Sequence, residues 1–258
     1  MYELELQRAL EVIEIVRPII LEIYNSDFAV EIKEDKSPVT KADQLVDQKV
    51  RTYLGSLYPD HAFLTEESED DPRRFDCDYV WIVDPIDGTK DFVGRDGEFT
   101  VNIALAYKHE IVVGVIHSPV KNVSYYAIKG AGAYKLEDGI HKQIKVNDKL
   151  EALTVVTSRY HLRPLEVETM EKHADKIKTR TTVGASLKAC LIAEGKAELS
   201  YRFSAGTKEW DIAPAQIIVE EAGGLFVKPD GTRYSYNRKD VVNQQGYVIA
   251  NRKENILL

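Results

Sequence analysis

The sequence predicts a mixed α/β protein in one unit, with an α+β lobe over residues 1–146 and an α/β lobe over residues 147–258. In the first half, two amphipathic helical patterns precede a run of strand-like segments, which is typical of a sheet covered by helices. In the second half, strand-like and helix-like segments alternate. No flexible linker or internal repeat separates the halves, so we expect two tightly packed lobes with the functional site between them.

Two helices are predicted early in the chain. Apolar side chains recur at helical spacing between residues 3 and 24 and again after Thr40. Pro18 should kink the first helix or weaken one of its turns. Between the helices, Val30 to Lys33 alternates like a strand and residues 35–38 form a loop. The apolar stripes consist of Leu6, Leu10, Ile13, Val16, Ile20 and Tyr24 in the first helix and of Ala42, Val46, Val50, Tyr53 and Leu57 in the second.

An antiparallel meander is predicted from Glu98 to Val146, followed by alternating strands and helices. The meander has strand-like segments at Phe99–Tyr107, Ile111–His117 and Val123–Ile128, separated by turn residues. The later strands are Leu153–Thr157, Thr181–Val183, Ala197–Phe203 and Leu225–Val227, and the later helices are Pro164–His173, Ser186–Glu194 and Asp211–Ala222.

The composition indicates a globular protein that does not bind nucleic-acid polymers. The chain has 258 residues, 44% hydrophobic and 29% charged, which is ordinary for a globular protein with a sizeable core. The formal net charge of -8 argues against a binder of nucleic-acid polymers, since such proteins are usually basic. Cys77 and Cys190 have no motif spacing, which suits a reducing cytoplasm. No apolar run approaches the roughly 20 residues that span a bilayer, and the N-terminus has no signal-peptide pattern.

The stretch WIVDPIDGT, which ends at Thr89, has the residue types of a metal site. The apolar run before Asp84 predicts a buried strand, and Pro85 should take the chain out of the sheet because proline cannot donate to a ladder. Asp87 and Gly88 then form a turn that brings two carboxylates together, and Thr89 begins a short helix. Asp, Pro and Gly are also ordinary turn residues, so the stretch alone fits a simple turn as well.

Acidic residues elsewhere favour a magnesium site over a simple turn. Glu66 and Glu67 follow another apolar run, and Asp211 lies far downstream in a helical pattern. Such carboxylates can converge on Mg²⁺, which prefers hard oxygen ligands. A calcium EF-hand is excluded, because its loop needs further acidic ligands at alternate positions.

These motifs resemble the inositol monophosphatase superfamily of magnesium-dependent, lithium-sensitive phosphatases, and within it the bacterial 3'(2'),5'-bisphosphate nucleotidases of the CysQ type. The resemblance covers nearly the whole chain in the family's order. It implies one unit with the layered αβαβα sandwich of that family. The matching segments are Thr65–Ser68, Trp81–Phe92, Gly97–Leu105, Gly184–Gly195 and Trp210–Pro214.

The resemblance also implies the ligands of two Mg²⁺ ions. One ion would take Glu66, Asp84 and the backbone carbonyl of Ile86, and the other would take Asp84, Asp87 and Asp211. A third, weaker ion would use Glu66. A metal-activated water would attack the phosphorus directly, with no phosphoenzyme. The cleaved phosphate would lie against Asp87, Gly88, Thr89 and Asp211.

Asp43 and Thr89 have structural interpretations beside the catalytic ones. Thr40-x-x-Asp43 has the form of a capping box, whereas the resemblance implies that Asp43 helps to orient the attacking water. We expect the catalytic role, with Thr40 alone capping the helix. The resemblance implies that Thr89 holds the water with Glu66 or Asp43, and the structural alternative is a helix cap. The amides of Gly88 and Thr89 would face the phosphate if a helix begins there.

Residues that choose the substrate are expected in the second half. Gly184-Ala185-Ser186 can present backbone amides at a helix start. The resemblance implies that Lys188 and Arg202 hold the phosphate that is not cleaved, and that a basic residue near His161 contacts the nucleotide. Lys188 lies in an otherwise apolar run, which argues against an ordinary surface cation. Inositol-specific relatives have an acid where this chain has Ser204, which disfavours an inositol phosphate.

The leading hypothesis is a magnesium-dependent 3'(2'),5'-bisphosphate nucleotidase that releases AMP and phosphate. The first alternative is an inositol or sugar monophosphatase with the same metal chemistry, and the second is a non-catalytic nucleotide- or metal-binding module. The complete carboxylate set argues against the second alternative. We expect a small phosphorylated nucleotide as partner, a homodimer, and a cytoplasmic location, with peripheral membrane association left open.

Overall fold

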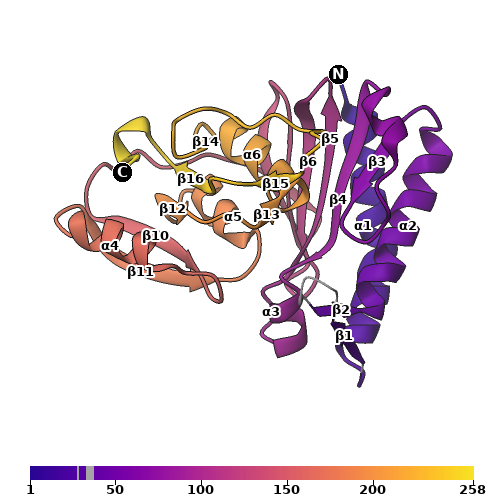
Figure 1. Cartoon of the computed structure of the whole chain (residues 1–258), viewed down its shortest axis with the longest axis horizontal. Coiled ribbons are helices and arrows are strands. Elements are labelled where there is room, and N and C mark those ends of the chain that lie inside the picture. Colours follow the sequence, from indigo (N-terminus) through magenta and orange to yellow (C-terminus); the bar gives the residue numbers. More distant parts are fainter. Residues whose placement is uncertain (28, 33–37) are drawn as a thin grey trace.

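The computed structural model describes residues 1–27, 29–32 and 38–258. Its helices and sheets stack in layers (Figure 1). Two helices cover one face of a seven-stranded sheet, two more lie between this sheet and a five-stranded sheet, and one packs on the far side. The predicted α/β class and layered αβαβα sandwich are thereby confirmed. In this order, the helices are α1 (Glu3–Tyr24) and α2 (Lys41–Leu57), α5 (Leu187–Ala193) and α6 (Glu209–Glu221), and α4 (Pro164–Lys172).

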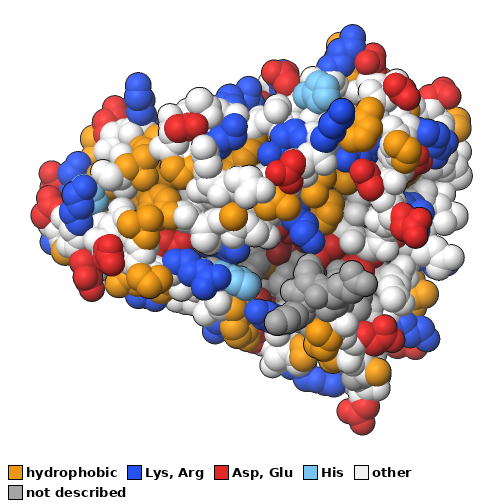
Figure 2. Space-filling model, in the orientation of Figure 1, with side chains coloured by type: hydrophobic (Ala, Val, Ile, Leu, Met, Phe, Trp, Pro, Cys, Tyr) orange, Lys and Arg blue, Asp and Glu red, His pale blue; other side chains and the backbone are white. Residues whose placement is uncertain are grey.

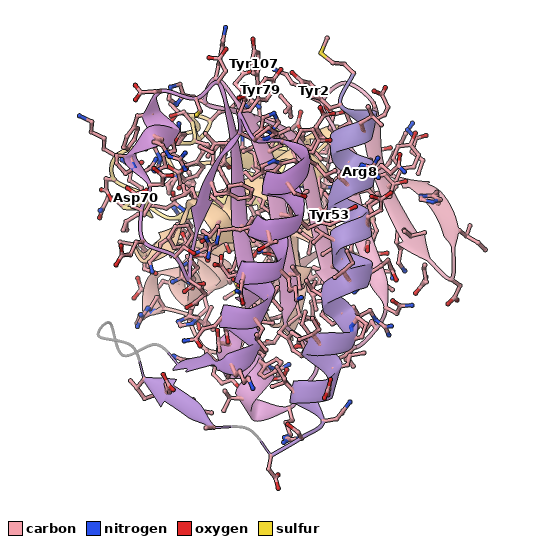
Figure 3. The ribbon with its side chains drawn as sticks, turned by 90° about the vertical axis from the view of Figure 1, so that its right-hand side faces the viewer. Tyr2, Arg8, Tyr53, Asp70, Tyr79 and Tyr107 are labelled. Carbon is pink, nitrogen blue, oxygen red and sulfur yellow. The ribbon has the colours of Figure 1, made fainter. Side chains whose placement is uncertain are left out.

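Helices α1 and α2 lie side by side on the outer face of the large sheet (Figure 3). Most of the predicted apolar stripes are buried there, and α1 continues through Pro18. Leu57 is an exception with 44% exposure, because the last turn of α2 buries Leu54 instead. The Tyr53 hydroxyl of α2 donates to Glu11 of α1 at 2.5 Å, which ties the two helices together.

A short hairpin connects these two helices. It consists of β1 (Val30–Ile32) and β2 (Pro38–Thr40), which pair antiparallel. The strand predicted from residue 30 is therefore present as far as Ile32. Residues 33–37, which include most of the predicted loop, lie outside the described residues.

The large sheet has the strand order β3-β4-β5-β6-β7-β8-β9. β3 runs parallel to β4, and each later neighbour pairs antiparallel, so the predicted meander is confirmed. The strands are β3 (Ala62–Thr65), β4 (Tyr79–Asp87), β5 (Thr100–Tyr107), β6 (Glu110–Ser118), β7 (Val123–Ile128), β8 (Gly132–Glu137) and β9 (Ile140–Ile144).

Strand β4 continues past the point where Pro85 was expected to end it. Its pairing with β5 jumps from Asp84, opposite Asn102, to Asp87, opposite Thr100. Proline is tolerated at such an irregularity because no ladder donor is required there. The prediction of a break was therefore wrong, and the irregularity carries both aspartates at the end of a strand.

The smaller sheet has the order β11-β10-β12-β16-β14 and mixes parallel with antiparallel pairs. The predicted alternation of strands and helices is present, although β11 is longer than predicted. Strand β16 was not predicted from the sequence. The elements are β10 (Leu153–Ser158), β11 (Ile177–Val183), β12 (Leu199–Arg202), β14 (Leu225–Val227) and β16 (Tyr247–Ala250), with β13 (Thr207–Lys208) and β15 (Val242–Asn243) forming a separate pair.

Helix α6 is the buried centre of the molecule. It contacts β4, β5, β6, β7 and β8 of the large sheet and β14 of the small one. Gly114 of β6 allows this close approach, since a Cβ there would lie 2.5 Å from Ile217 and 3.0 Å from Pro214 of α6. The packing fixes the height of the first turn of α6, which carries Asp211, relative to the large sheet.

Charged side chains of both signs are distributed over the visible face of the molecule (Figure 2), as expected for a chain with 29% charged residues. On the face seen in Figure 2, basic and acidic side chains are interspersed over the coloured area. Cys77 and Cys190 are free thiols, and Cys190 is buried. Within the described ranges, no helix has the length and apolar character that a membrane span requires.

We predict opposite effects for two glycine-to-alanine substitutions. Gly114→Ala should lower the free energy of unfolding by about 1–3 kcal/mol, because the new methyl group overpacks the contact between β6 and α6. Gly55→Ala should raise it by roughly 0.5–1 kcal/mol, because alanine favours the interior of a helix. The nearest atom to the new Cβ at residue 55 lies at an ordinary 3.5 Å. Urea unfolding measures both, and a neutral Gly114→Ala would contradict the packing described.

Candidate functional site

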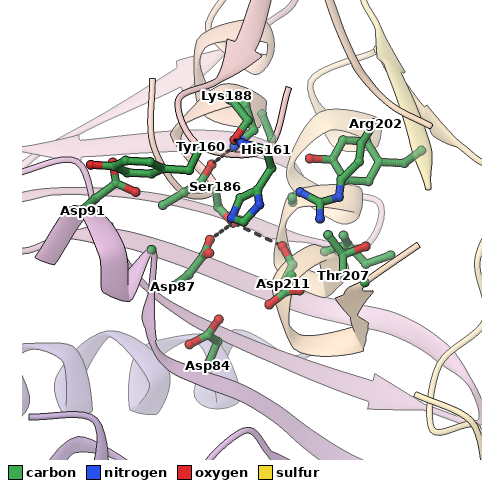
Figure 4. Close-up of a pocket in the computed structure, with 18 of the residues that line it drawn as sticks. Asp84, Asp87, Asp91, Tyr160, His161, Ser186, Lys188, Arg202, Thr207 and Asp211 are labelled. Carbon is green, nitrogen blue, oxygen red and sulfur yellow. Dashed lines mark hydrogen bonds between the residues drawn. The ribbon is translucent and has the colours of Figure 1, made fainter. Parts of the chain in front are cut away.

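A cavity of about 390 Å³ lies between the end of β4 and the second half of the chain (Figure 4). This volume is within the range of small-molecule sites. One wall consists of the end of β4 and the start of α3 (Thr89–Gly94), and the other includes residues of α5, β12 and α6. The cavity therefore collects side chains from both halves of the sequence.

Three carboxylates predicted as metal ligands converge in this cavity. Asp84, Asp87 and Asp211 each place an oxygen within 4.8 Å of the others (Figure 4). Glu66, which follows β3, lines the same cavity. Because β3 is parallel to β4, the ends of both strands deliver their acidic residues to the same edge of the sheet.

The convergence of these acids is electrostatically unfavourable without a cation. Burial raises the pKa of Asp84 well above its usual range, and the charges of Glu66, Asp87 and Asp211 raise it further. Burial, followed by Asp87 and Glu66, raises the pKa of Asp211 to about 7. A set of hard carboxylate oxygens in such a position fits a divalent cation such as Mg²⁺, whose charge would favour the ionised forms.

The turn after β4 is fixed by its own hydrogen bonds. The Ile86 amide donates to Asp84 Oδ1 at 3.1 Å, and the Thr89 hydroxyl donates to the Ile86 carbonyl at 3.2 Å. Gly88 has a φ of 87°, and a Cβ there would lie 3.1 Å from the Cβ of Ala185. The turn therefore requires glycine where the two halves of the chain meet. Ile86, Gly88 and Thr89 all line the cavity. A metal contact by the Ile86 carbonyl and phosphate contacts by Gly88 and Thr89 stay predictions.

Asp87 is oriented by two polar side chains. Ser186 Oγ lies 2.6 Å from Asp87 Oδ2 as a donor, and Asn102 Nδ2 donates to the same oxygen at 3.1 Å. Asn102 also donates to Ser186 Oγ at 3.0 Å. Asn102 was not predicted as a site residue, although an amide within the apolar run of β5 was a usable signal in the sequence.

Asp43 takes part in the cap of α2, so the prediction that Thr40 alone caps this helix was wrong. Asp43 Oδ2 accepts bonds from the Thr40 amide at 2.8 Å and from its hydroxyl at 2.7 Å, which closes the capping box of α2. Asp43 is buried, and Glu66 contributes to raising its pKa after the main effect of burial. Among the described residues, Asp43 is not part of the cavity lining. It therefore caps the helix close behind the acidic site, and its role in orienting the attacking water stays a prediction.

The predicted anion-binding turn at Gly184 is only partly available. The Gly184 amide donates to Glu98 Oε2 at 3.0 Å, so it is not presented to a ligand as expected. Ala185 and Ser186 do line the cavity, and Ala185 has a φ of 50°. The Ala185 carbonyl accepts a bond from Lys188 Nζ, which bends the lysine back over its own turn.

Basic side chains lie in the cavity wall contributed by the second half. Lys188, Arg202 and His161 all line it (Figure 4). Burial lowers the pKa of Lys188, and it lowers that of His161 to about 4, with smaller contributions from Arg202, Lys90 and Lys188. Desolvation beside other cations disfavours the charged form of the His161 imidazole. Contact of His161 with the nucleotide stays a prediction.

The loop that carries His161 is held by an ionic contact between the two halves. Arg159 lies 3.4 Å from both Asp91 and Asp96 and also pairs with Glu98. Burial and the neighbouring Asp96 raise the pKa of Asp91 to about 7. Asp91, Asp96 and Glu98 form a second acidic cluster, and Arg159 pairs with all three. These ion pairs fix the position of the loop.

Several lining residues had no signal in the sequence. Tyr160, 47% exposed, lies at the cavity, and the apolar side of the cavity comes from α6 and the small sheet. These apolar residues are separated along the chain, in α6, β14 and the unpredicted strand β16, so no local pattern brings them together. They are Ile212, Ala215, Phe226, Tyr247 and Ile249.

The chain is similar in sequence to a known protein family and to named members of it. A model of the inositol monophosphatase family matches residues 3–257. The 3'(2'),5'-bisphosphate nucleotidase CysQ of Salmonella typhimurium is 37% identical over 237 residues, which cover 90% of this chain and 93% of that protein. The protein of the same name from Escherichia coli K12 is 36% identical with the same coverage.

Solved structures give the same grouping. CysQ from Bacteroides thetaiotaomicron, described as a bacterial member of the inositol monophosphatase family, has a TM-score of 0.83 and 32% identity, with coverage of 98% of this chain and 99% of that one. The suhB protein of Bartonella henselae shares the fold at a TM-score of 0.82, with 24% identity and 97% coverage of each chain. From residue 3 to residue 257, therefore, the chain belongs to the inositol monophosphatase family.

Proposed function

We propose that this protein is a magnesium-dependent 3'(2'),5'-bisphosphate nucleotidase that converts adenosine 3'(2'),5'-bisphosphate to AMP and phosphate. The observation that carries the proposal is a cavity with carboxylates on one side and basic side chains on the other. Such a cavity can accept a molecule with two phosphate groups, one held through metal and one by direct ion pairs. The CysQ relatives carry the name of this activity.

The carboxylates are proposed to hold two Mg²⁺ ions, with a third, weaker ion using Glu66. Asp84 would be shared between the two ions, Glu66 and the Ile86 carbonyl would complete one site, and Asp87 and Asp211 the other. Bound Mg²⁺ supplies charge neutralisation and activation of a water for attack on phosphorus. The protein's contribution is to hold the oxygens in place, as Ser186 and Asn102 do for Asp87.

Thr89 is proposed to orient the attacking water. Its hydroxyl lies at the turn and donates to the Ile86 carbonyl at 3.2 Å. Glu66 lines the same cavity and is the proposed second partner of that water. Asp43 would act indirectly, because its described bonds go to the cap of α2 and its charge is felt at Asp84.

The second phosphate is assigned to Lys188 and Arg202. Both side chains line the cavity across from the carboxylates (Figure 4). Arg202 contributes to the lowered pKa of Lys188, which means that two cations face one space and favour an anion there. Ser204 has a buried hydroxyl with no partner among the described residues. The resemblance implies that inositol-specific relatives have an acid at this position.

The proposal also covers the division of the chain into lobes, its oligomeric state and its location. The metal site would belong to a lobe over residues 1–146 and the substrate-binding residues to a lobe over residues 147–258. We further propose a cytoplasmic homodimer with a small phosphorylated nucleotide as its partner. Sedimentation of the purified protein tests the dimer independently of the activity.

We predict that Mg²⁺ raises the melting temperature of the protein, because a ligand of the folded state stabilises it. Asp211→Asn should melt higher than the wild type in EDTA, since it removes repulsion from a buried site. It should also lose most of the Mg²⁺-induced gain. Asp138→Asn, in an exposed turn with a φ of 52°, is the control and should respond to Mg²⁺ like the wild type. Equal Mg²⁺ responses in the wild type and Asp211→Asn would contradict the assigned ligand.

Phosphate release from adenosine 3',5'-bisphosphate, 3'-AMP and inositol 1-phosphate tests the activity itself. The wild type should have its highest kcat/KM with the bisphosphate, because binding of the remote phosphate helps to position the reacting one. Lys188→Ala should lower that value by at least about tenfold, since a charge-assisted contact contributes more than roughly 1.4 kcal/mol. Its effect on 3'-AMP should be small.

The exposed Lys142→Ala serves as the control for loss of a cation and should leave all three rates unchanged. A wild type that prefers inositol 1-phosphate would replace the nucleotidase with the monophosphatase. A bisphosphate preference that survives Lys188→Ala would preserve the activity and refute the assignment of Lys188.

A further inference from the structure

A buried charged network outside the cavity joins the two halves of the chain. Its first member is Arg74, in the 3-10 helix η1 (Pro72–Phe75) that follows β3 and Glu66. The Arg74 side chain is fully buried, with 0% exposure. Burial of a guanidinium is costly unless its donors are paired, so its partners must be held in place.

Arg74 finds those partners in a distant turn of the chain. It pairs with Asp70 beside it, and Nη1 donates to Asn237 Oδ1 at 2.7 Å and to the Arg238 carbonyl at 3.0 Å. Asn237 Nδ2 in turn donates to the Arg74 carbonyl at 2.7 Å. Asn237 has a φ of 58°, a conformation that asparagine tolerates better than most residues. The Asn237 side chain therefore accepts a hydrogen bond from the Arg74 guanidinium and donates one to the Arg74 backbone carbonyl.

The same turn is bound from the other side by Glu209, the first residue of α6. Glu209 is fully buried. It accepts hydrogen bonds from the backbone amide of Asn237 at 2.6 Å and from the backbone amide of Arg238 at 2.9 Å. Arg238 Nε adds an ion pair to Glu209 at 3.0 Å. The Asn237-Arg238 turn is thus clamped between η1 and the start of α6.

The network continues from Arg238 to Asp211. Arg238 Nη2 donates to Asn243 Oδ1 at 2.7 Å, and Asn243 Nδ2 donates to the Lys208 carbonyl at 2.9 Å. The Lys208 amide then donates to Asp211 Oδ2 at 2.7 Å. Each step is a hydrogen bond between described residues, so the clamp reaches the backbone that orients Asp211.

We propose that the Asn237-Arg238 turn is a positioning device for the metal site. Held by Arg74 and Glu209, it fixes the start of α6, and therefore Asp211, against the segment that carries Glu66. It holds the acidic residues together despite their mutual repulsion, so that the site is formed before a cation binds. This inference rests on the proposed function, because it assumes that these carboxylates bind Mg²⁺.

A purely stabilising network is the alternative, and the two make different predictions. Loss of a stabilising contact lowers the melting temperature equally with and without Mg²⁺. Loss of a positioning contact also weakens Mg²⁺ binding, because the ligands must first be brought together. Groups that orient metal ligands change metal affinity by about 10- to 100-fold when removed.

Asn237→Gly is the test variant, because glycine accepts the positive φ and the change removes only the side-chain bonds to Arg74. Calorimetric titration of the full-length metal-free protein with Mg²⁺ should give about tenfold weaker binding or worse than the wild type. The Mg²⁺-induced rise in melting temperature should shrink accordingly. Arg73→Ala is the matched control, since Arg73 lies in the same segment, pairs only with Asp71 among its described ion pairs, and is 82% exposed.

Asn237→Asp keeps an acceptor for Arg74 and loses the donor, so it should bind Mg²⁺ with intermediate affinity. It also keeps the test decisive if the glycine variant does not fold. Unchanged Mg²⁺ affinity in the folded variants would overturn the positioning role and leave the proposed function intact. A wild type without Mg²⁺ binding would overturn both.

Discussion

Repulsion between buried carboxylates is the constraint on which this structure depends. Asp84 and Asp87 come from the end of one strand, and Asp211 comes from the helix between the sheets. Burial and mutual charge raise the pKa of Asp84 and Asp211, so the site is under electrostatic strain unless a cation neutralises it. A fold that keeps such groups within 4.8 Å of one another must hold them rigidly. A divalent cation fits this arrangement, because it would neutralise the repulsion between the carboxylates.

The two halves of the chain provide this rigidity by different means. In the first, the paired strands β3 and β4 end at the same edge, and β5 contributes Asn102 to fix Asp87. In the second, α6 is packed against Gly114 and bound through Glu209 to the Asn237-Arg238 turn. The cavity lies where these two supports meet, which gives the site an acidic side and a basic side.

The sequence predicted the local features well because they depend on neighbouring residues. The strand before Asp84, the turn at Gly88 and the helix at Thr89 all follow from short patterns. Features that depend on partners far along the chain could not be read in this way. The Gly184 amide was assigned to a ligand, but Glu98 occupies it, and Asn237 showed no pattern that pointed to Arg74. Asp43 shows the limit within one motif, because its pattern allowed two roles and the hydrogen bonds of the described residues show only the cap.

The most direct test of this account is the position of bound metal in a crystal of the protein soaked in Mn²⁺, read from anomalous scattering. Two peaks bonded to Asp84 are expected, one shared with Glu66 and the Ile86 carbonyl and one shared with Asp87 and Asp211. A map without a peak among these carboxylates would contradict it. So would a strongest peak at Asp91, Asp96 and Glu98, where the described structure has Arg159 instead.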